Sequence, residues 1–104
     1  MENKIHYSPR AQNDLDDIWE YITLELRNPI AAKYTVNGIM DAIDNLKSFL
    51  ETGEILHLPN GLNSGYRFVQ HENYLAFYRI SHSDVFVDRV IYGKRDYMRI
   101  LFGT

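Results

Sequence analysis

A chain of 104 residues, 45% of them hydrophobic, has the length of one domain and can bury one modest core. It contains no cysteine, which excludes disulfides and zinc sites built on thiolates. The net charge of −3 divides unevenly, because residues 1–57 carry ten acidic and five basic side chains and residues 58–104 carry four acidic and six basic ones. If an acidic or polyanionic partner binds this chain, we therefore expect it to bind the second half.

The start of the chain, Met1 to His6, lacks the apolar core of a signal peptide. The longest apolar stretches are also shorter than the ~20 residues that cross a bilayer. The sequence thus predicts a cytoplasmic protein without membrane contact, formed by one domain over residues 1–104.

Two helices are predicted in the first half, after a short alternating strand over residues 3–7. Ser8-Pro9 provides an N-cap and a proline at the first helical position, and Asn28-Pro29 ends this helix and begins the next, which runs to about Leu50. Residues spaced by three and four give each helix an apolar stripe. The stripes comprise Leu15, Ile18, Trp19, Ile22 and Leu26, then Ala32, Val36, Ile39, Ile43, Leu46 and Leu50, widened by Tyr34, Met40 and Phe49.

The second half is predicted to be a sheet. Glycine, proline and asparagine punctuate residues 51–65, which we interpret as a long loop. Three strands joined by short turns follow at residues 66–70, 74–81 and 85–92, as in an antiparallel meander. The expected fold class is therefore α+β: an N-terminal strand and an antiparallel helix hairpin packed on one face of an antiparallel sheet. We expect the other face to be open, with Leu75 and Phe77 exposed as a partner surface.

Arginines are the first candidates for chemistry. Arg67, Arg79 and Arg89 fall on the three consecutive strands and are expected to line one face, with Arg95 beside them. Clustered guanidinium groups bind phosphate or carboxylate and stabilise developing negative charge. The alternative is that they form surface ion pairs with the acids of the second half, which are Glu72, Asp84, Asp88 and Asp96.

Other catalytic signals are weak. The four histidines lack metal-ligand spacing, so no metal and no cofactor are predicted. The acids Asp14, Asp16, Asp17 and Glu20 are expected to form a solvated helix face. The last residues, in contrast, place cationic and aromatic groups directly after a strand, namely Lys94, Arg95, Tyr97 and Arg99, followed by Leu101.

Three segments in this order resemble the RelE/ParE family of type II toxin–antitoxin toxins, whose fold is the one predicted above. Ser8-Pro-Arg-Ala with Asp14-Leu-Asp-Asp-Ile-Trp-Glu-Tyr-Ile22 is similar to the first helix of the family, especially in its ParE branch. Tyr66-Arg-Phe-Val and Tyr74-Leu-Ala-Phe-Tyr-Arg-Ile80 resemble the central hairpin. Val90-Ile-Tyr-Gly-Lys-Arg-Asp-Tyr-Met-Arg-Ile-Leu101 resembles the last strand and tail.

The resemblance leaves two targets open. RelE-like members cleave mRNA on the ribosome, and Arg67, Arg95 and Tyr97 would be the catalytic residues here. Val69 and Leu75, however, replace cationic groups of that nuclease, and apolar residues cannot neutralise phosphate. ParE-like members inhibit DNA gyrase and need no nuclease site, which favours that branch. The residues that would then contact gyrase are Lys94, Arg95, Tyr97, Arg99 and Leu101.

The resemblance also implies a cognate antitoxin, with which the chain would form a hetero-oligomer. Leu75, Phe77 and Arg79 are the residues expected to bind an acidic amphipathic segment of that antitoxin. A third reading of the sequence is an interaction module without toxic activity.

Overall fold

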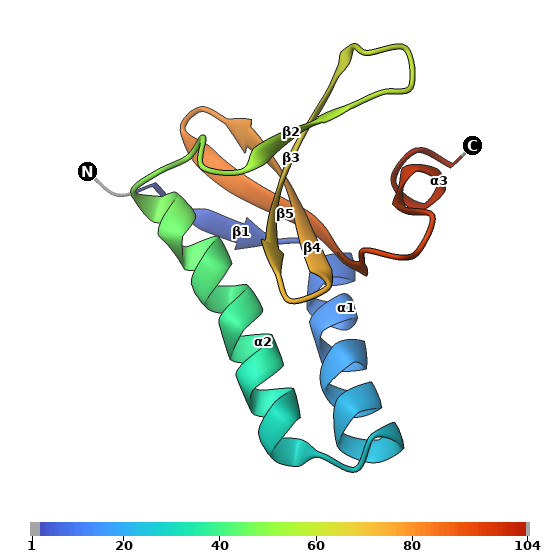
Figure 1. Ribbon diagram of the computed structural model, residues 1–104. Helices are drawn as coiled ribbons and strands as arrows, with labels where there is room; N and C mark the ends of the chain where they lie inside the picture. The colour runs from blue at the N-terminus through green and yellow to red at the C-terminus, as the bar shows by residue number, and fades with distance from the viewer. Residues whose placement is uncertain (1–2, 104) are drawn as a thin grey trace.

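The structure, a computed structural model, describes residues 3–103. Two helices lie against one face of a sheet, and a short C-terminal helix lies on its other side (Figure 1). In chain order the elements are β1 (Ile5–Tyr7), α1 (Pro9–Glu20), the π-helical turn η1 (Tyr21–Glu25), α2 (Pro29–Asp44), the 3₁₀ turn η2 (Asn45–Lys47), β2 (Glu54–His57), β3 (Asn63–His71), β4 (Tyr74–Ser81), β5 (Asp84–Tyr92) and α3 (Tyr97–Phe102).

The sheet has five strands in the order β1-β5-β4-β3-β2. The predicted α+β class and the antiparallel meander of β3, β4 and β5 are confirmed. The first strand differs from the expectation of a purely antiparallel sheet, because β1 pairs in parallel with β5, with Ile5 opposite Val85. A strand connected to the sheet only through a helix hairpin can run in either direction, so the sheet is mixed.

Both helix starts are confirmed. Ser8 Oγ accepts a hydrogen bond from the Ala11 amide at 3.0 Å, and Asn28 Oδ1 accepts one from the Ala31 amide at 3.0 Å. Each cap precedes a proline at the first helical position. The ends differ from the prediction: α1 stops at Glu20 and continues as the wider turn η1, and α2 gives way to η2 after Asp44.

The helix stripes form the larger of two cores, but they are narrower than predicted. Their central residues are buried together with Tyr78, Val85, Val87 and Val90 of the sheet. Trp19 and Leu26 are instead 41% and 56% exposed, and Tyr34, Met40 and Phe49 are exposed as well. A helix on a sheet buries a limited arc of its surface, so apolar residues beside that arc remain in solvent.

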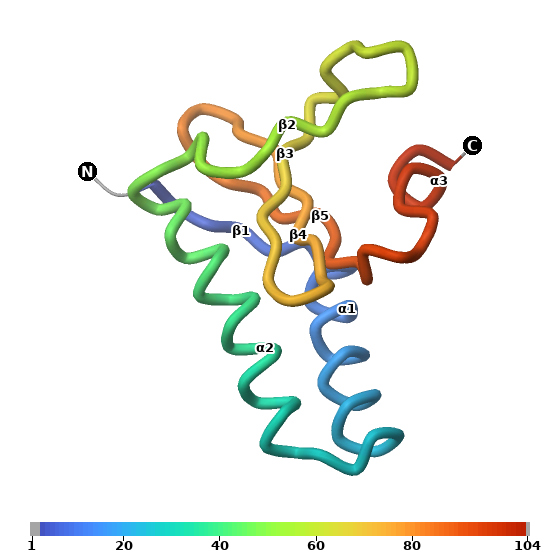
Figure 2. The backbone as a smooth tube through the Cα atoms, in the orientation of Figure 1, coloured from blue at the N-terminus to red at the C-terminus, as the bar shows by residue number. Residues whose placement is uncertain are grey.

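The prediction of one long loop over residues 51–65 was wrong. These residues contain β2 and the start of β3, which pair with Glu54 opposite Phe68 and His57 opposite Asn63. The turn residues bound this hairpin, and Gly61 at its tip has a φ of 87°. Pairing of β3 with β4 ends at Arg67 and Tyr78, beyond which the β2–β3 hairpin projects away from the rest of the sheet (Figure 2).

The second face of the sheet is not open. Leu75 is 8% exposed and Phe77 is fully buried, in a smaller core with Leu56 and Ile91. The expectation that Leu75 and Phe77 are exposed was therefore wrong. The residues that cover them belong to the tail and were not recognised as a helix: Tyr97, Met98, Ile100, Leu101 and Phe102.

Gly38 allows the turn between β3 and β4 to approach α2. A Cβ atom at Gly38 would lie 2.1 Å from the His71 ring, so only glycine fits without displacing that ring. Thr35 on the same helix donates a hydrogen bond to Glu72 at 2.9 Å. The turn is thus fixed against α2 by a close approach and by a polar contact.

Asp14 joins α1 to β5. Its carboxylate accepts two hydrogen bonds from the Arg89 guanidinium, at 2.8 and 3.0 Å, and a third from the Val90 amide at 2.9 Å. The side chains of Asp14 and Arg89 are only 13% and 15% exposed. Asp14 therefore does not belong to the solvated acidic face predicted for α1, whereas Asp16, Asp17 and Glu20 are exposed as expected.

Replacing Asp14 by alanine should lower the free energy of unfolding by about 3 kcal/mol, because a largely buried guanidinium and a strand amide both lose their partner. Chemical denaturation measures this change. Asp17→Ala, on the exposed face of the same helix, is the matched control and should stay within ~0.5 kcal/mol of the wild type. Equal effects of the two substitutions would contradict the assigned role of the Asp14–Arg89 pair.

Candidate functional site

The tail that follows β5 is held by turns and by a capped helix. The Gly93 amide donates to the Asn73 carbonyl at 2.7 Å, where the chain leaves the sheet. Asp96 caps α3 by accepting from the Arg99 amide at 3.3 Å, and Gly103 ends the helix with a φ of 72°. These local contacts fix the tail, although α3 has only six residues.

The tail residues predicted to bind a target separate into two groups. Lys94, Arg95 and Arg99 are exposed. Tyr97 and Leu101 are partly buried against the smaller core, and the ring centroid of Tyr97 lies 5.4 Å from that of Phe77. The apolar side of α3 thus attaches the tail to the sheet, and its cations face solvent.

The strand arginines do not line one face, contrary to the prediction. Arg89 stands opposite Phe77, on the face that α3 covers, and its guanidinium pairs with Asp14 of α1. Arg67 stands opposite Tyr78, on the helix side of the sheet, and donates to the Gly53 carbonyl at 3.0 Å. Arg79 forms an ion pair with Asp88 at 2.7 Å, one of the acids named in the surface ion-pair alternative.

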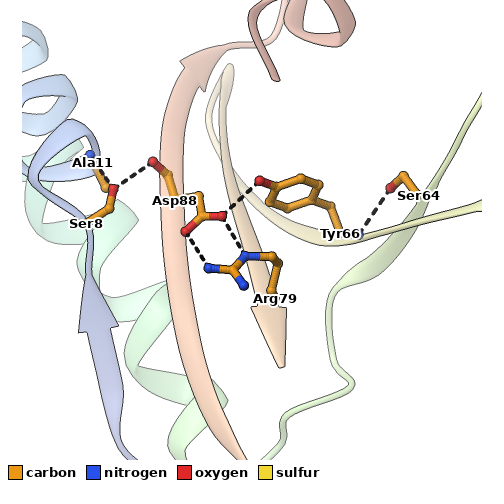
Figure 3. A network of polar contacts seen from close by, with 6 residues as sticks. All are labelled: Ser8, Ala11, Ser64, Tyr66, Arg79 and Asp88. Atoms are coloured by element: carbon orange, nitrogen blue, oxygen red, sulfur yellow. Dashed lines mark hydrogen bonds and ion pairs between the residues drawn. The ribbon is translucent and has the colours of Figure 1, made fainter. Parts of the chain in front are cut away.

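Asp88 is the centre of a polar network, of which the sequence indicated only the ion pair with an arginine (Figure 3). Its carboxylate accepts from Arg79 twice and from the Tyr66 hydroxyl at 2.8 Å, while Ser8 donates to its carbonyl at 2.8 Å. Burial and the bond to Asp88 raise the pKa of Tyr66, so the phenol remains a donor at neutral pH. The hydrogen bonds that Arg79 donates to Asp88 likewise raise the pKa of Arg79. The network links the start of α1 to three strands.

The three residues expected to catalyse RNA cleavage are not brought together. Tyr97 packs on Phe77, on the face opposite to Arg67. In the strand register, Arg67 of β3 pairs with Tyr78 of β4, which pairs with Val87 of β5. Arg95 instead lies beyond the end of β5. This separates Arg67 from Arg95 by roughly 15 Å along the strand direction.

A hollow of about 590 Å³, here called the helix-side cleft, lies between α1, η1 and the adjoining ends of β4 and β5. Arg95 is the only residue of the cleft that the sequence singled out as a binding residue. Strand pairing and the docking of α1 create the cleft, so only knowledge of the register could have revealed it. Its other lining residues are Asp14, Asp17, Ile18, Tyr21, Leu26, Tyr74, Val90 and Tyr92.

Neither a metal centre nor a membrane span is found in the part of the chain that the structure describes. Over residues 3–103, no three histidine and acidic side chains gather as ligands for a metal ion. No helix in the same range is long and apolar enough to cross a bilayer.

The family comparison gives a clear match. The model of the ParE toxin of the type II toxin–antitoxin system parDE matches residues 5–97. The match spans the sheet, both long helices and the start of the tail. It confirms the resemblance to RelE/ParE toxins and to the ParE branch. No curated protein matches the chain.

Solved structures show the same fold. The chain is similar to one from the chromosomal ParDE system of P. aeruginosa, with a TM-score of 0.68 and 19% identity over 86% of this chain and 94% of that one. A chain of the RelBE2 toxin–antitoxin complex from Mycobacterium tuberculosis gives a TM-score of 0.52 and 21% identity, over 88% of this chain and 92% of that one. At these identities the similarity establishes the fold alone.

Replacing Tyr97 by alanine should detach α3, because the ring packs on Phe77 and the helix is too short to persist alone. We expect faster amide exchange over residues 97–103 and a loss of about 1–2 kcal/mol in the free energy of unfolding. Tyr34→Ala, at a tyrosine that is 71% exposed, is the control and should change neither quantity. Unchanged exchange in the Tyr97 variant would show that the tail does not depend on this contact.

Proposed function

The chain belongs to the family of ParE toxins of type II toxin–antitoxin systems, and from this membership we propose that it inhibits growth by binding DNA gyrase and is neutralised by a cognate antitoxin. The family match supports the ParE-like activity over the RelE-like one. The proposal requires a binding surface for gyrase and no catalytic site.

The observation that carries this proposal is the separation of Arg67, Arg95 and Tyr97. Cleavage of a phosphodiester needs an acid, a base and cations within reach of one phosphate. Arg67 donates to the backbone carbonyls of Glu51 and Gly53, and Tyr97 is packed on the far face of the sheet. Such an arrangement favours an inhibitor that acts by binding over a nuclease that assembles these groups.

The tail is the surface that we assign to gyrase. Lys94, Arg95 and Arg99 are exposed on a short segment whose other side is held by Tyr97 and Leu101. Among residues 3–103, Arg99 forms an ion pair only with Asp96, at 4.0 Å, and this exposed pair is well screened by solvent. The guanidinium and ammonium groups therefore remain accessible to an acidic partner surface. Tyr97 and Leu101 act as positioning residues in this scheme.

The antitoxin proposal changes in one respect because of the fold. The two structurally similar chains come from the ParDE system and from the RelBE2 toxin–antitoxin complex, which supports an antitoxin partner for this chain. Of its predicted contacts, Arg79 is accessible, but Leu75 and Phe77 lie beneath α3. An antitoxin segment that binds these two residues must replace α3. It would then displace the cations that we assign to gyrase, so the two partners would exclude each other.

A short induction of the chain without antitoxin tests the target. We expect labelled thymidine incorporation to fall before labelled methionine incorporation, because blocked gyrase stops replication first. Arg67→Ala should leave this response unchanged, since the side-chain hydrogen bonds of Arg67 within the described residues go only to backbone carbonyls of its own chain. An early fall in methionine incorporation that Arg67→Ala abolishes would instead establish the ribonuclease. If incorporation of neither label falls, the remaining interpretation is an interaction module that has no toxic activity.

Removing the tail cations tests the assigned surface. The triple variant Lys94→Ala, Arg95→Ala and Arg99→Ala should weaken inhibition of gyrase supercoiling by about tenfold or more, through lost contacts with acidic groups. The control carries Lys4→Ala, Arg10→Ala and Lys33→Ala, which remove the same charge from other exposed positions. Equal loss in both variants would attribute the effect to net charge and not to the tail.

A further inference from the structure

An apolar groove continues along α1 and η1, beyond the helix-side cleft. A second hollow of about 280 Å³ is lined by Asp17, Glu20, Tyr21, Leu24 and Glu25. It shares Asp17 and Tyr21 with the helix-side cleft, so the two hollows adjoin each other. Together they form one surface, here called the helix-side groove.

The helix-side groove exposes large apolar side chains. Tyr21 is 53% exposed, Leu24 is 61% exposed and Leu26 is 56% exposed. Ile18 and Val90 are buried in the floor of the cleft, where Tyr74 and Tyr92 pack edge to face with ring centroids 5.5 Å apart. Burial, with the nearby charge of Glu72 and the neighbouring tyrosines, raises the pKa of Tyr74, so its phenol is neutral at physiological pH. The groove thus offers apolar and aromatic contacts that no described part of the chain covers.

The charge of the groove is one-sided. Asp17, Glu20 and Glu25 are exposed, and none of them forms an ion pair with another residue between positions 3 and 103. Asp14 at the inner edge is already neutralised by Arg89. Arg95 supplies the single cation of the lining, at one end. Three free carboxylates beside exposed leucine and tyrosine repel an acidic ligand and attract a basic one.

We infer that the helix-side groove docks a basic amphipathic segment of a partner protein, with leucine-like or aromatic anchors between Tyr21, Leu24 and Leu26 and with lysine or arginine facing Asp17, Glu20 and Glu25. The volumes of the hollows suit side-chain anchors, and the carboxylates that follow one another along α1 and η1 suit a ligand whose cations recur on one face. This surface is distinct from the cationic tail assigned to gyrase. The inference does not depend on that assignment.

The test uses two short helical peptides as probes, both with leucine on one face and with either lysine or glutamate on the other. Titration calorimetry with the full chain should show the lysine peptide binding about tenfold or more tightly than the glutamate peptide. The variant Asp17→Lys, Glu20→Lys and Glu25→Lys should reverse this preference. The control variant Asp16→Lys, Asp41→Lys and Glu51→Lys makes the same change of net charge at exposed positions outside the groove and should keep the wild-type preference.

A second pair of substitutions tests the apolar anchors. Tyr21→Ser with Leu24→Ser should weaken binding of the lysine peptide by about tenfold, without unfolding the chain, because both side chains are largely exposed. Wild-type affinity in this variant would overturn the inference, as would an equal loss in the groove and control charge variants. Concentration-dependent self-association of the chain, lost on Asp17→Lys with Glu20→Lys, would also overturn it, because the occupant would then be the cationic tail of a second copy.

Discussion

The attachment of α1 to β5 is the constraint on which both functional surfaces depend. Within three consecutive residues, β5 presents a carbonyl to Ser8, a guanidinium to Asp14 and an amide to the same carboxylate. Two points of α1, nearly two turns apart, are therefore fixed on one strand. Because β5 leads directly into the tail, the position of the helix pair and the position of the cationic tail are set by the same contacts. Without this attachment the helix-side cleft would have no fixed second wall.

A short chain here covers both faces of its sheet. The helix pair buries one face, and six residues of α3 bury the other around Phe77. The second cover is thin, since α3 contains no fully buried residue of its own. The exposed cations Lys94 and Arg95 lie in the turn just before α3, and Arg99 lies on its solvent side. The apolar side chains on one side of the tail thus attach it to the core, and the cations on its other side are assigned to a partner.

Local signals predicted the fold well, and long-range contacts explain most of what they missed. Ser8-Pro9 and Asn28-Pro29 began helices as expected, because capping depends only on neighbouring residues. The alternation and the short turns gave the meander of β3, β4 and β5. The burial of Phe77, in contrast, depends on a tail that is distant in sequence, and the pairing of Asp14 with Arg89 joins residues 75 positions apart. Periodicity cannot distinguish a solvated acid from one that meets an arginine across the fold. For the same reason the sequence named the tail cations but not the tyrosines of the helix-side cleft.

The close approach of Gly38 to His71 couples substitutions at two positions that are distant in the sequence. Position 38 can acquire a methyl group only if the ring at position 71 moves or becomes smaller. Relatives with alanine at the first position should therefore carry a compact residue at the second, and the two should covary. A shift of His71 would also affect the helix-side cleft, because His71 is paired with Tyr74, which lines that cleft. A substitution in α2 can in this way reshape a binding surface that α2 does not line.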